Sequence, residues 1–386
     1  MSALLTELES PPLPSPDAHW QEWLDYGLLW ASMVERHPMV EPASPIVAGA
    51  PARRADEASR ILTLHAYRET TPGPRWQALY AATWPAYRRW YTREGLAARP
   101  SLGECRRALV QHLPELVPTW ERLCRLTGDD PVAARMLSMW GPPAFAVGCS
   151  QVLIPGEQPT LIRNYDYDPA LFEGVIASTN YSGHRRVLGT SDMLWGLLDG
   201  MNEDGLAISL TFGGRPGGGE GFGIPIVMRY LLETCATVEQ GVSALRRIPV
   251  AQSYNVAMVD TTGSHATVFV APEQPAVVSR LEATTNHRLS QVEHPANAAR
   301  FNSVGRLTRL EQLRGDDASG ERLVAAMLQP PLRNNQFDVG FGTLYTAKYE
   351  PAAATATWYW PETSWTRRFD DRDAVRTVDL ATRPGS

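Results

Sequence analysis

The dipeptide Gly148-Cys149 is the first point at which the sequence suggests a reaction. A thiol can attack the carbonyl of the peptide bond before it, form a thioester and release its own nitrogen as an amine. The freed α-amino group has a pKa of about 7.7–8.0, so it can accept the thiol proton near neutral pH. Glycine before the cysteine leaves the attacked carbonyl sterically open. A Gly-Cys pair alone is far more typical of an ordinary buried cysteine than of a nucleophile.

Two further charged residues follow in the segment RNYDYDP at 163–169. The β-like runs AVGCSQVLI and TLIRNYDYD flank the turn sequence PGEQP, which predicts a hairpin. The returning strand would bring Arg163 and Asp166 near Cys149. An arginine would lower the thiol pKa and a carboxylate would orient the amine. An ion pair at a solvated strand end explains the same two residues equally well.

Four ordered blocks carry a resemblance to the cysteine N-terminal-nucleophile (Ntn) hydrolases: GCSQ at 148–151, RNYDYDP at 163–169, LLDGMNEDGLAISL at 197–210 and TTNH at 284–287. That superfamily includes choloylglycine hydrolases, penicillin V acylases and acyl-coenzyme A:6-aminopenicillanic acid acyltransferases. The acyltransferase-like branch is the most similar. The helical sequence from about 100 to 148 also resembles the segment that precedes the nucleophile in this family.

The resemblance implies an α+β fold, a four-layer αββα sandwich preceded by a mainly helical N-terminal segment. It makes Cys149 the nucleophile, with Arg163 and Asp166 as its partners. By the same pattern Asn286 is a polar contact or an oxyanion donor. Arg306, in the Ser-x-x-Arg element that begins at Ser303, would complete the site.

The chain departs from the family pattern at the second oxyanion position. Some relatives carry an asparagine on the strand after Gly-Met-Asn, where this chain has Leu210-Thr211-Phe212. Thr211 or a backbone N–H would have to serve instead. The glycine-rich segment 213–219 lacks a Gly-Lys-Ser/Thr ending, so it predicts a loop beside the pocket rather than a phosphate site. His287 is expected next to the pocket and His184 at the surface.

The pattern along the chain predicts two parts, an N-terminal mainly helical segment 1–148 and an Ntn catalytic domain 149–386. Residues 1–18 are Pro-rich and are expected to be disordered. Apolar periodicity and capping signals predict helices at 76–95, 104–126, 224–235, 300–314 and 320–328, and one beginning at Thr237. Strands are predicted between them, with a closing hairpin at FGTLYTAKYEP and ATATWYW.

Composition excludes several classes of protein. The 386 residues carry a net charge of -6, which gives no electrostatic basis for binding nucleic acid. No apolar run approaches a membrane span, and the N-terminal sequence lacks the basic and apolar regions of a secretory signal, so a cytoplasmic location is expected. Neither the cysteines nor the aspartates Asp199, Asp204 and Asp260, assigned to turns, have metal-ligand spacing. We therefore expect no cofactor and no metal, with Cys105, Cys124 and Cys235 as buried apolar residues.

The function expected from the sequence is self-cleavage at Gly148/Cys149, followed by cleavage of a linear amide through a Cys149 thioester. The alternative is acyl transfer, for example from acyl-CoA, to an amine acceptor. An inactive Ntn-fold binding scaffold is the non-enzyme alternative. The expected partner is a small-molecule acyl substrate. The two processed chains are expected to stay associated, and a homo-oligomer is left open.

Overall fold

The computed structural model describes residues 61–145, 147–215, 217–289, 298, 301–315, 319–337 and 341–380. The predicted disorder of residues 1–18 lies outside this part of the chain.

A nine-stranded sheet forms one half of the molecule, in the order β10-β9-β8-β7-β6-β5-β4-β1-β15. All neighbours are antiparallel except β1 and β4, which run parallel. The strands are β1 (Ile61–Glu69), β4 (Val175–Thr179), β5 (Val187–Asp192), β6 (Gly196–Asn202), β7 (Ala207–Phe212), β8 (Tyr254–Val259), β9 (His265–Ala271), β10 (Gln274–Ser279) and β15 (Ala374–Asp379).

A six-stranded antiparallel sheet faces the first, in the order β11-β2-β3-β12-β13-β14. Its strands are β2 (Gly148–Ile154), β3 (Thr160–Tyr167), β11 (Ala283–Thr284), β12 (Gly342–Glu350), β13 (Thr355–Trp360) and β14 (Thr363–Arg367). The predicted hairpin around PGEQP is β2–β3, and the predicted closing hairpin is β12–β13. Both predictions are confirmed.

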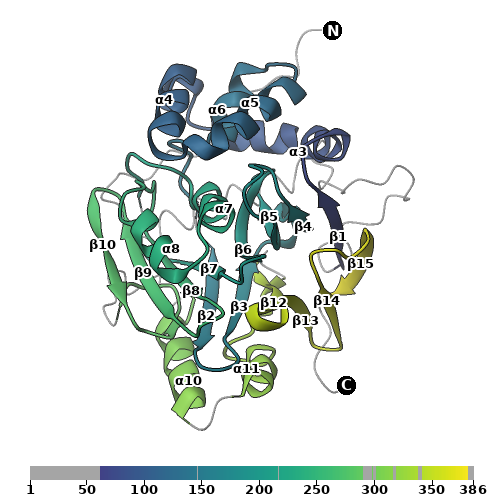
Figure 1. Cartoon of the computed structure of the whole chain (residues 1–386), viewed down its shortest axis with the longest axis vertical. Coiled ribbons are helices and arrows are strands. Elements are labelled where there is room, and N and C mark those ends of the chain that lie inside the picture. The colour runs from purple at the N-terminus through teal and green to yellow at the C-terminus, as the bar shows by residue number, and fades with distance from the viewer. Residues whose placement is uncertain are drawn as a thin grey trace, which may run out of the picture.

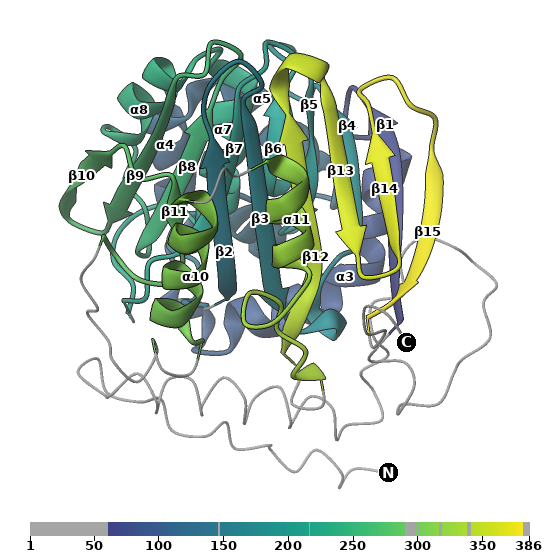
Figure 2. The same cartoon turned by 90° about the horizontal axis from the view of Figure 1, so that it is seen from below.

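Helices cover the outer face of each sheet. Helices α7 (Ile224–Thr234) and α8 (Val238–Leu245) pack on β6 and β9 of the larger sheet, and α10 (Ser303–Gly315) and α11 (Gly320–Met327) pack on the smaller sheet. Figure 1 shows the layers from top to bottom, and Figure 2 looks through α10 and α11 onto the smaller sheet with the larger sheet behind it. The predicted αββα sandwich is therefore confirmed. All four helices begin within a few residues of their predicted starts.

The N-terminal part adds a further helical layer beyond α7 (Figure 1). It comprises α3 (Pro74–Thr92), α4 (Leu102–His112), α5 (Val117–Leu126) and α6 (Pro131–Leu137). The helix predicted over 104–126 is in fact two helices, because Pro114 and Pro118 interrupt it, and a 3₁₀ turn lies between them. The short 3₁₀ helices are η1 (Leu96–Ala98), η2 (Pro114–Leu116), η3 (Pro169–Leu171) and η5 (Pro351–Ala353).

Strand β1 ties this N-terminal part to the catalytic half. It lies in the larger sheet between β4 and β15, with His65 opposite Val175 on one side and Val375 on the other. The sequence analysis did not predict this strand. The N-terminal segment therefore shares a continuous hydrogen-bonded sheet with the domain that follows Cys149.

A polar strip runs through the otherwise apolar space between the two sheets. Gln151 on β2 donates to the carbonyl of Asn255 at 3.1 Å and to Oγ1 of Thr284 at 2.8 Å. The hydroxyl of Ser209 donates to Oε1 of Gln151 at 2.6 Å. Since buried polar groups are stable only when hydrogen-bonded, this network fixes how β2 sits on β7 and β8. Gln151 lies two residues from Cys149 along β2.

Candidate active site

The β2–β3 hairpin sorts the predicted site residues onto two faces. Cys149 lies opposite Tyr165, and Gly148 lies opposite Asp166. Because side chains alternate along a strand, Cys149 and Arg163 point between the sheets, whereas Asp166 points toward α10. The sulfur and the Gly148–Cys149 peptide are therefore contacted by different groups.

The sulfur of Cys149 is held by Arg163. Nη2 of Arg163 lies 3.3 Å from Sγ, and Nε donates to the carbonyl of Leu210 at 3.0 Å. Nη1 forms an ion pair with Asp199 and donates to the Tyr345 hydroxyl at 3.2 Å. With the guanidinium fully buried and anchored to these acceptors, its position beside the sulfur is fixed.

Asp199 was assigned to a turn from the sequence, and that assignment was wrong. It lies within β6, is fully buried, and accepts hydrogen bonds from Tyr345 at 2.7 Å and Tyr349 at 2.5 Å besides its ion pair with Arg163. The Asp-Gly dipeptide suggested a turn, but the turn occurs at Glu203–Asp204. All seven residues of β6 are buried, so no alternation of polar and apolar residues marks this strand in the sequence.

The thiol of Cys149 is protonated in the uncut chain near neutral pH. Burial raises its pKa, and Asp166 acts in the same direction, while Arg163 and Arg306 oppose the rise. The side chain has no exposed surface. Formation of a thiolate at Cys149 therefore depends on Arg163 and Arg306, which oppose the rise in its pKa. Reaction with a substrate also requires that the sulfur become exposed.

The side chain of Asn286 forms hydrogen bonds with the backbone on both sides of Gly148. Its Oδ1 accepts the N–H of Cys149 at 3.0 Å, and its Nδ2 donates to the carbonyl of Val147 at 3.2 Å. Strand β11 pairs with β2 just before this residue, with Thr284 opposite Gln151, which brings Asn286 alongside Cys149. The predicted site asparagine is thus in direct contact with the predicted cleavage junction.

Arg306 and Asp166 complete the helix-facing side. Arg306 extends from α10, and its Nη1 donates to the carbonyl of Cys149 and to Oγ of Ser150, both at 2.6 Å. Its Nη2 donates to Oδ1 of Asn286 at 2.7 Å. Asp166 lies 3.6 Å from Nη1 of Arg306, and burial raises its pKa although Arg306 lowers it. The fold brings together all five predicted catalytic residues.

A side chain at position 148 would be crowded by its neighbours. A Cβ built there would lie 2.6 Å from Cζ of Phe341 and 3.1 Å from Oδ2 of Asp166. Contacts this short force neighbouring atoms to move. The Asp166 carboxylate therefore faces the residue whose carbonyl would be attacked.

The hydroxyl of Thr211, predicted as an oxyanion donor, is hydrogen-bonded to Thr285 and Asn255. Its hydroxyl donates to the carbonyl of Thr285 at 3.0 Å and accepts from Nδ2 of Asn255 at 3.0 Å. Asn255, which the sequence analysis did not single out, also donates to the carbonyl of His287 at 3.0 Å. Thr211 and Asn255 thus hydrogen-bond to the backbone on either side of Asn286 and fix the loop that carries it. An oxyanion role for Thr211 stays a prediction.

The two histidines lie where they were expected. His287 is buried beside the site, with Nδ1 2.7 Å from Oγ of Ser303, and burial lowers its pKa. His184 is exposed. Within the described residues, no group of three His, Cys, Asp or Glu side chains is arranged to hold a metal ion. None of the described helices has the length and apolar character needed to cross a bilayer.

Residues 154–365 match the model of the acyl-coenzyme A:6-aminopenicillanic acid acyl-transferase family. The match spans more than half of the chain, and the chain belongs to this family. Among curated proteins, none matches it.

Solved structures of Ntn hydrolases are similar at low identity. A mutant conjugated bile acid hydrolase from Clostridium perfringens is 12% identical, with a TM-score of 0.40, over 60% of this chain and 96% of that one. A Caenorhabditis elegans N-acylethanolamine-hydrolyzing acid amidase ortholog is 16% identical, with a TM-score of 0.41, over 56% and 98%. Penicillin V acylase from Agrobacterium tumefaciens is 16% identical, with a TM-score of 0.37, over 60% and 92%.

Proposed function

We propose that the chain cuts itself between Gly148 and Cys149 and that Cys149 then acts as the nucleophile of an amide-cleaving enzyme. In the first step Sγ bonds to the carbonyl carbon of Gly148, and the Gly148–Cys149 C–N bond breaks. The thiol proton goes to the departing nitrogen, which becomes the α-amine of Cys149. Water then hydrolyses the thioester, leaving the Gly148 carboxylate and the regenerated thiol.

The observation that carries this proposal is the pair of hydrogen bonds by which the Asn286 side chain holds the backbone at the Gly148–Cys149 junction. One side chain holds Val147 O and Cys149 N, at 3.2 Å and 3.0 Å, and so fixes the peptide between them. The absence of a side chain at Gly148 leaves the attacked carbonyl open, and Asp166 lies against that residue. Geometry fixed on both sides of a reacting bond favours an intramolecular attack.

The same groups have a role after cleavage. Loss of Val147 from the site would leave Nδ2 of Asn286 without that acceptor, so it could donate to the oxyanion of a substrate carbonyl. The new α-amine would take the thiol proton, with Asp166 and Asn286 beside it. Arg163, 3.3 Å from the sulfur, would stabilise the thiolate. The product of the first half-reaction is a thioester on Cys149 and a released amine.

Acyl transfer is the second candidate, and the family match supports it. An acyltransferase would form the same thioester, with acyl-CoA as one candidate donor, and would pass the acyl group to an amine instead of water. The two reactions share every residue named above. They differ only in which nucleophile reaches the thioester.

Intact-mass spectrometry tests the cleavage. The wild-type chain should appear as fragments 1–148 and 149–386, whereas Cys149→Ala should remain one chain of 386 residues without activity. Cys149→Ser should still cut slowly, because a hydroxyl can perform the same acyl shift. The matched control is Cys235→Ala, which removes a buried thiol elsewhere and should mature normally. A Cys149→Ala chain that is still cut at this bond would refute self-processing.

The two fragments should stay together after cleavage. Strand β1 belongs to the first fragment, yet it pairs with β4 and β15 of the second. They should therefore co-elute in size-exclusion chromatography without denaturant and separate only when unfolded. Separation under native conditions would contradict this expectation.

A further inference from the structure

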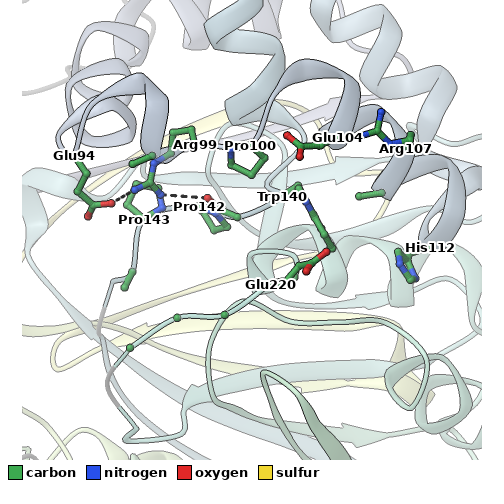
Figure 3. Close-up of a pocket in the computed structure, with 18 of the residues that line it drawn as sticks. Glu94, Arg99, Pro100, Glu104, Arg107, His112, Trp140, Pro142, Pro143 and Glu220 are labelled. Atoms are coloured by element: carbon green, nitrogen blue, oxygen red, sulfur yellow. Dashed lines mark hydrogen bonds and ion pairs between the residues drawn. The ribbon is translucent and has the colours of Figure 1, made fainter. Parts of the chain in front are cut away.

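The backbone that leads to the cleavage junction belongs to no regular element. Residues 141–145 and Val147 lie in neither a helix nor a strand, between α6 and β2. Residues 141–144 border a cavity of about 1070 Å³, and Figure 3 shows Pro142 and Pro143 at its edge. A segment that faces a cavity has fewer packing contacts on that side, so its path depends more on hydrogen bonds from neighbouring side chains.

Two arginines of the N-terminal part hold the beginning of this segment. Nη1 of Arg99 donates to the carbonyl of Gly141 at 3.2 Å, and Nη2 of Arg93 donates to the carbonyl of Ala144 at 2.9 Å. Arg99 is itself ion-paired with Glu94 (Figure 3). Both arginines precede the junction in the sequence, so these contacts do not connect the segment to the domain that follows it.

Gln252 connects the segment to the domain that follows Cys149. It lies in the loop before β8, and its side chain pairs with both backbone groups of Phe145. The N–H of Phe145 donates to Oε1, and Nε2 donates to the carbonyl of Phe145, each at 3.1 Å. Only 4% of Gln252 is exposed. Since one buried amide satisfies the donor and the acceptor of one residue, it fixes both the position and the direction of the backbone there.

A second set of described contacts joins Gln252 to Asn286. The hydroxyl of Tyr254 donates to Oε1 of Gln252 at 3.3 Å. Tyr254 lies opposite Phe212 where β8 pairs with β7, and the carbonyl of Phe212 accepts a hydrogen bond from Nδ2 of Asn286 at 3.2 Å. The two amide side chains that hold the backbone before Cys149 are therefore both fixed to the same edge of the larger sheet.

We propose that Gln252 is a positioning residue for self-cleavage, which holds the backbone at Phe145 so that the Gly148 carbonyl stays within reach of the Cys149 sulfur. The inference rests on the proposed cleavage and adds a residue to it. Asn286 holds the junction itself, and Gln252 holds the chain just before it. Holding the chain at two places restricts the orientations of the peptide to be cut, which favours an intramolecular attack.

Intact-mass time courses after rapid purification test this role. Gln252→Ala should slow the cut at least about tenfold, because the peptide spends less time in the attacking geometry. The side chain contacts Phe145 and Tyr254 rather than a reacting atom, so iodoacetamide should alkylate Cys149 of the matured variant at the wild-type rate. Gln240→Ala removes an exposed glutamine on α8 and should match wild type. An unchanged cleavage rate, or an equal loss in cleavage and in alkylation, would overturn the proposal.

Gln252→Glu gives a readout that a general loss of stability does not. A protonated carboxyl has one donor and one acceptor, as the amide has, whereas a carboxylate only accepts and cannot donate to the carbonyl of Phe145. Burial raises the pKa of such a carboxyl above its ordinary value of about 4.3. The cleavage rate of this variant, divided by that of wild type at the same pH, should therefore rise as pH falls from about 8 to about 5. For Gln252→Ala this ratio should stay constant. A constant ratio for Gln252→Glu as well would contradict the role of the hydrogen bonds.

Hydrogen exchange tests the hydrogen bonds without requiring cleavage. In the uncut Cys149→Ala chain, adding Gln252→Ala should make the peptide that covers residues 140–148 exchange faster, because the N–H of Phe145 loses its acceptor. The peptide that covers α8 should be unchanged, which shows that the fold is intact. Equal exchange of residues 140–148 in both chains would overturn the proposal. Failure of the proposed function would appear separately, as a wild-type chain that stays uncut by mass although this exchange difference is present.

Discussion

Nη2 of Arg163 lies 3.3 Å from Sγ of Cys149, while its Nη1 is ion-paired with Asp199. Neither Arg163 nor Asp199 has any exposed surface. The arginine thus contacts both the Asp199 side chain and the sulfur that would become the thiolate. Substituting it disturbs the fold as well as the chemistry, because a buried carboxylate without its partner costs about 3–5 kcal/mol.

Removing Arg163 should raise the pKa of the Cys149 thiol. To avoid an uncompensated carboxylate, the variant is Arg163→Gln combined with Asp199→Asn. Loss of the adjacent cation should move the pKa of Cys149 upward by about one unit or more. The measurement is the pH dependence of iodoacetamide alkylation of matured enzyme.

Two controls assign this shift to the arginine. Asp199→Asn alone keeps the cation beside the sulfur and should leave the thiol pKa closer to wild type. Arg309→Gln removes an exposed arginine on α10 and should change nothing. An alkylation profile of the double variant that overlays the wild type would make Arg163 purely structural.

A side chain at position 148 should block maturation. In Gly148→Ala the added Cβ would meet Phe341 at 2.6 Å and Asp166 Oδ2 at 3.1 Å. Strain of about 1.4 kcal/mol or more in the attacking geometry slows cleavage about tenfold or more. Time-resolved intact-mass spectrometry after rapid purification measures the rate.

A second substitution distinguishes a local clash from general misfolding. Phe341→Ala removes the closest atom, so Gly148→Ala with Phe341→Ala should recover part of the cleavage rate. Gly218→Ala, at a glycine with room for a Cβ, should mature normally. Normal cleavage of Gly148→Ala would mean that the open carbonyl is unimportant.

The residues around Cys149 could be predicted because they lie in short motifs on neighbouring strands. The turn sequence PGEQP set the hairpin, and the hairpin places Asp166 opposite Gly148. Asn286 and Arg306 could be placed only through the family resemblance, since 137 and 157 residues separate them from Cys149. No local pattern encodes contacts over such distances.

Other features were missed because tertiary packing overrides local signals. Asp199 follows two leucines and precedes a glycine, which is typical of a turn, yet Arg163 and two tyrosines make it stable inside a strand. Strand β1 is a nine-residue run in an otherwise helical segment, and its pairing partners β4 and β15 are distant in sequence. Its place in the sheet depends on those partners rather than on its own propensity.

A buried carboxyl pair should make stability fall as pH rises through the neutral range. Glu173 accepts the N–H of Leu194 at 2.6 Å and the hydroxyl of Tyr87 from α3, close to Asp192. Burial and then the charge of Asp192 raise the pKa of Glu173 from 4.5 to about 8. The folded state therefore holds a proton that the unfolded chain releases, and its stability is lost as pH rises from about 4.5 to about 8.

Glu173→Gln should remove this dependence, since the amide needs no proton. Urea unfolding at about pH 6 and about pH 9 should show a larger loss for wild type than for the variant, by about 1.4 kcal/mol for each pH unit between about 6 and about 8, where only the folded state holds the proton. Glu121→Gln, which removes an exposed helix carboxylate, should behave like wild type. Parallel losses in wild type and Glu173→Gln would show that other groups titrate.

The fate of the acyl group separates the two candidate reactions. We expect hydrolysis, so the Cys149 thioester should break down in plain buffer at the steady-state rate. The physical difference between the two reactions is the access of water to the thioester. A chromogenic acyl donor, with and without benzylamine, measures both steps in one burst experiment. Under hydrolysis the amine should divert only a minor part of the acyl group. A burst followed by almost no turnover until the amine is added would instead establish acyl transfer as the main reaction.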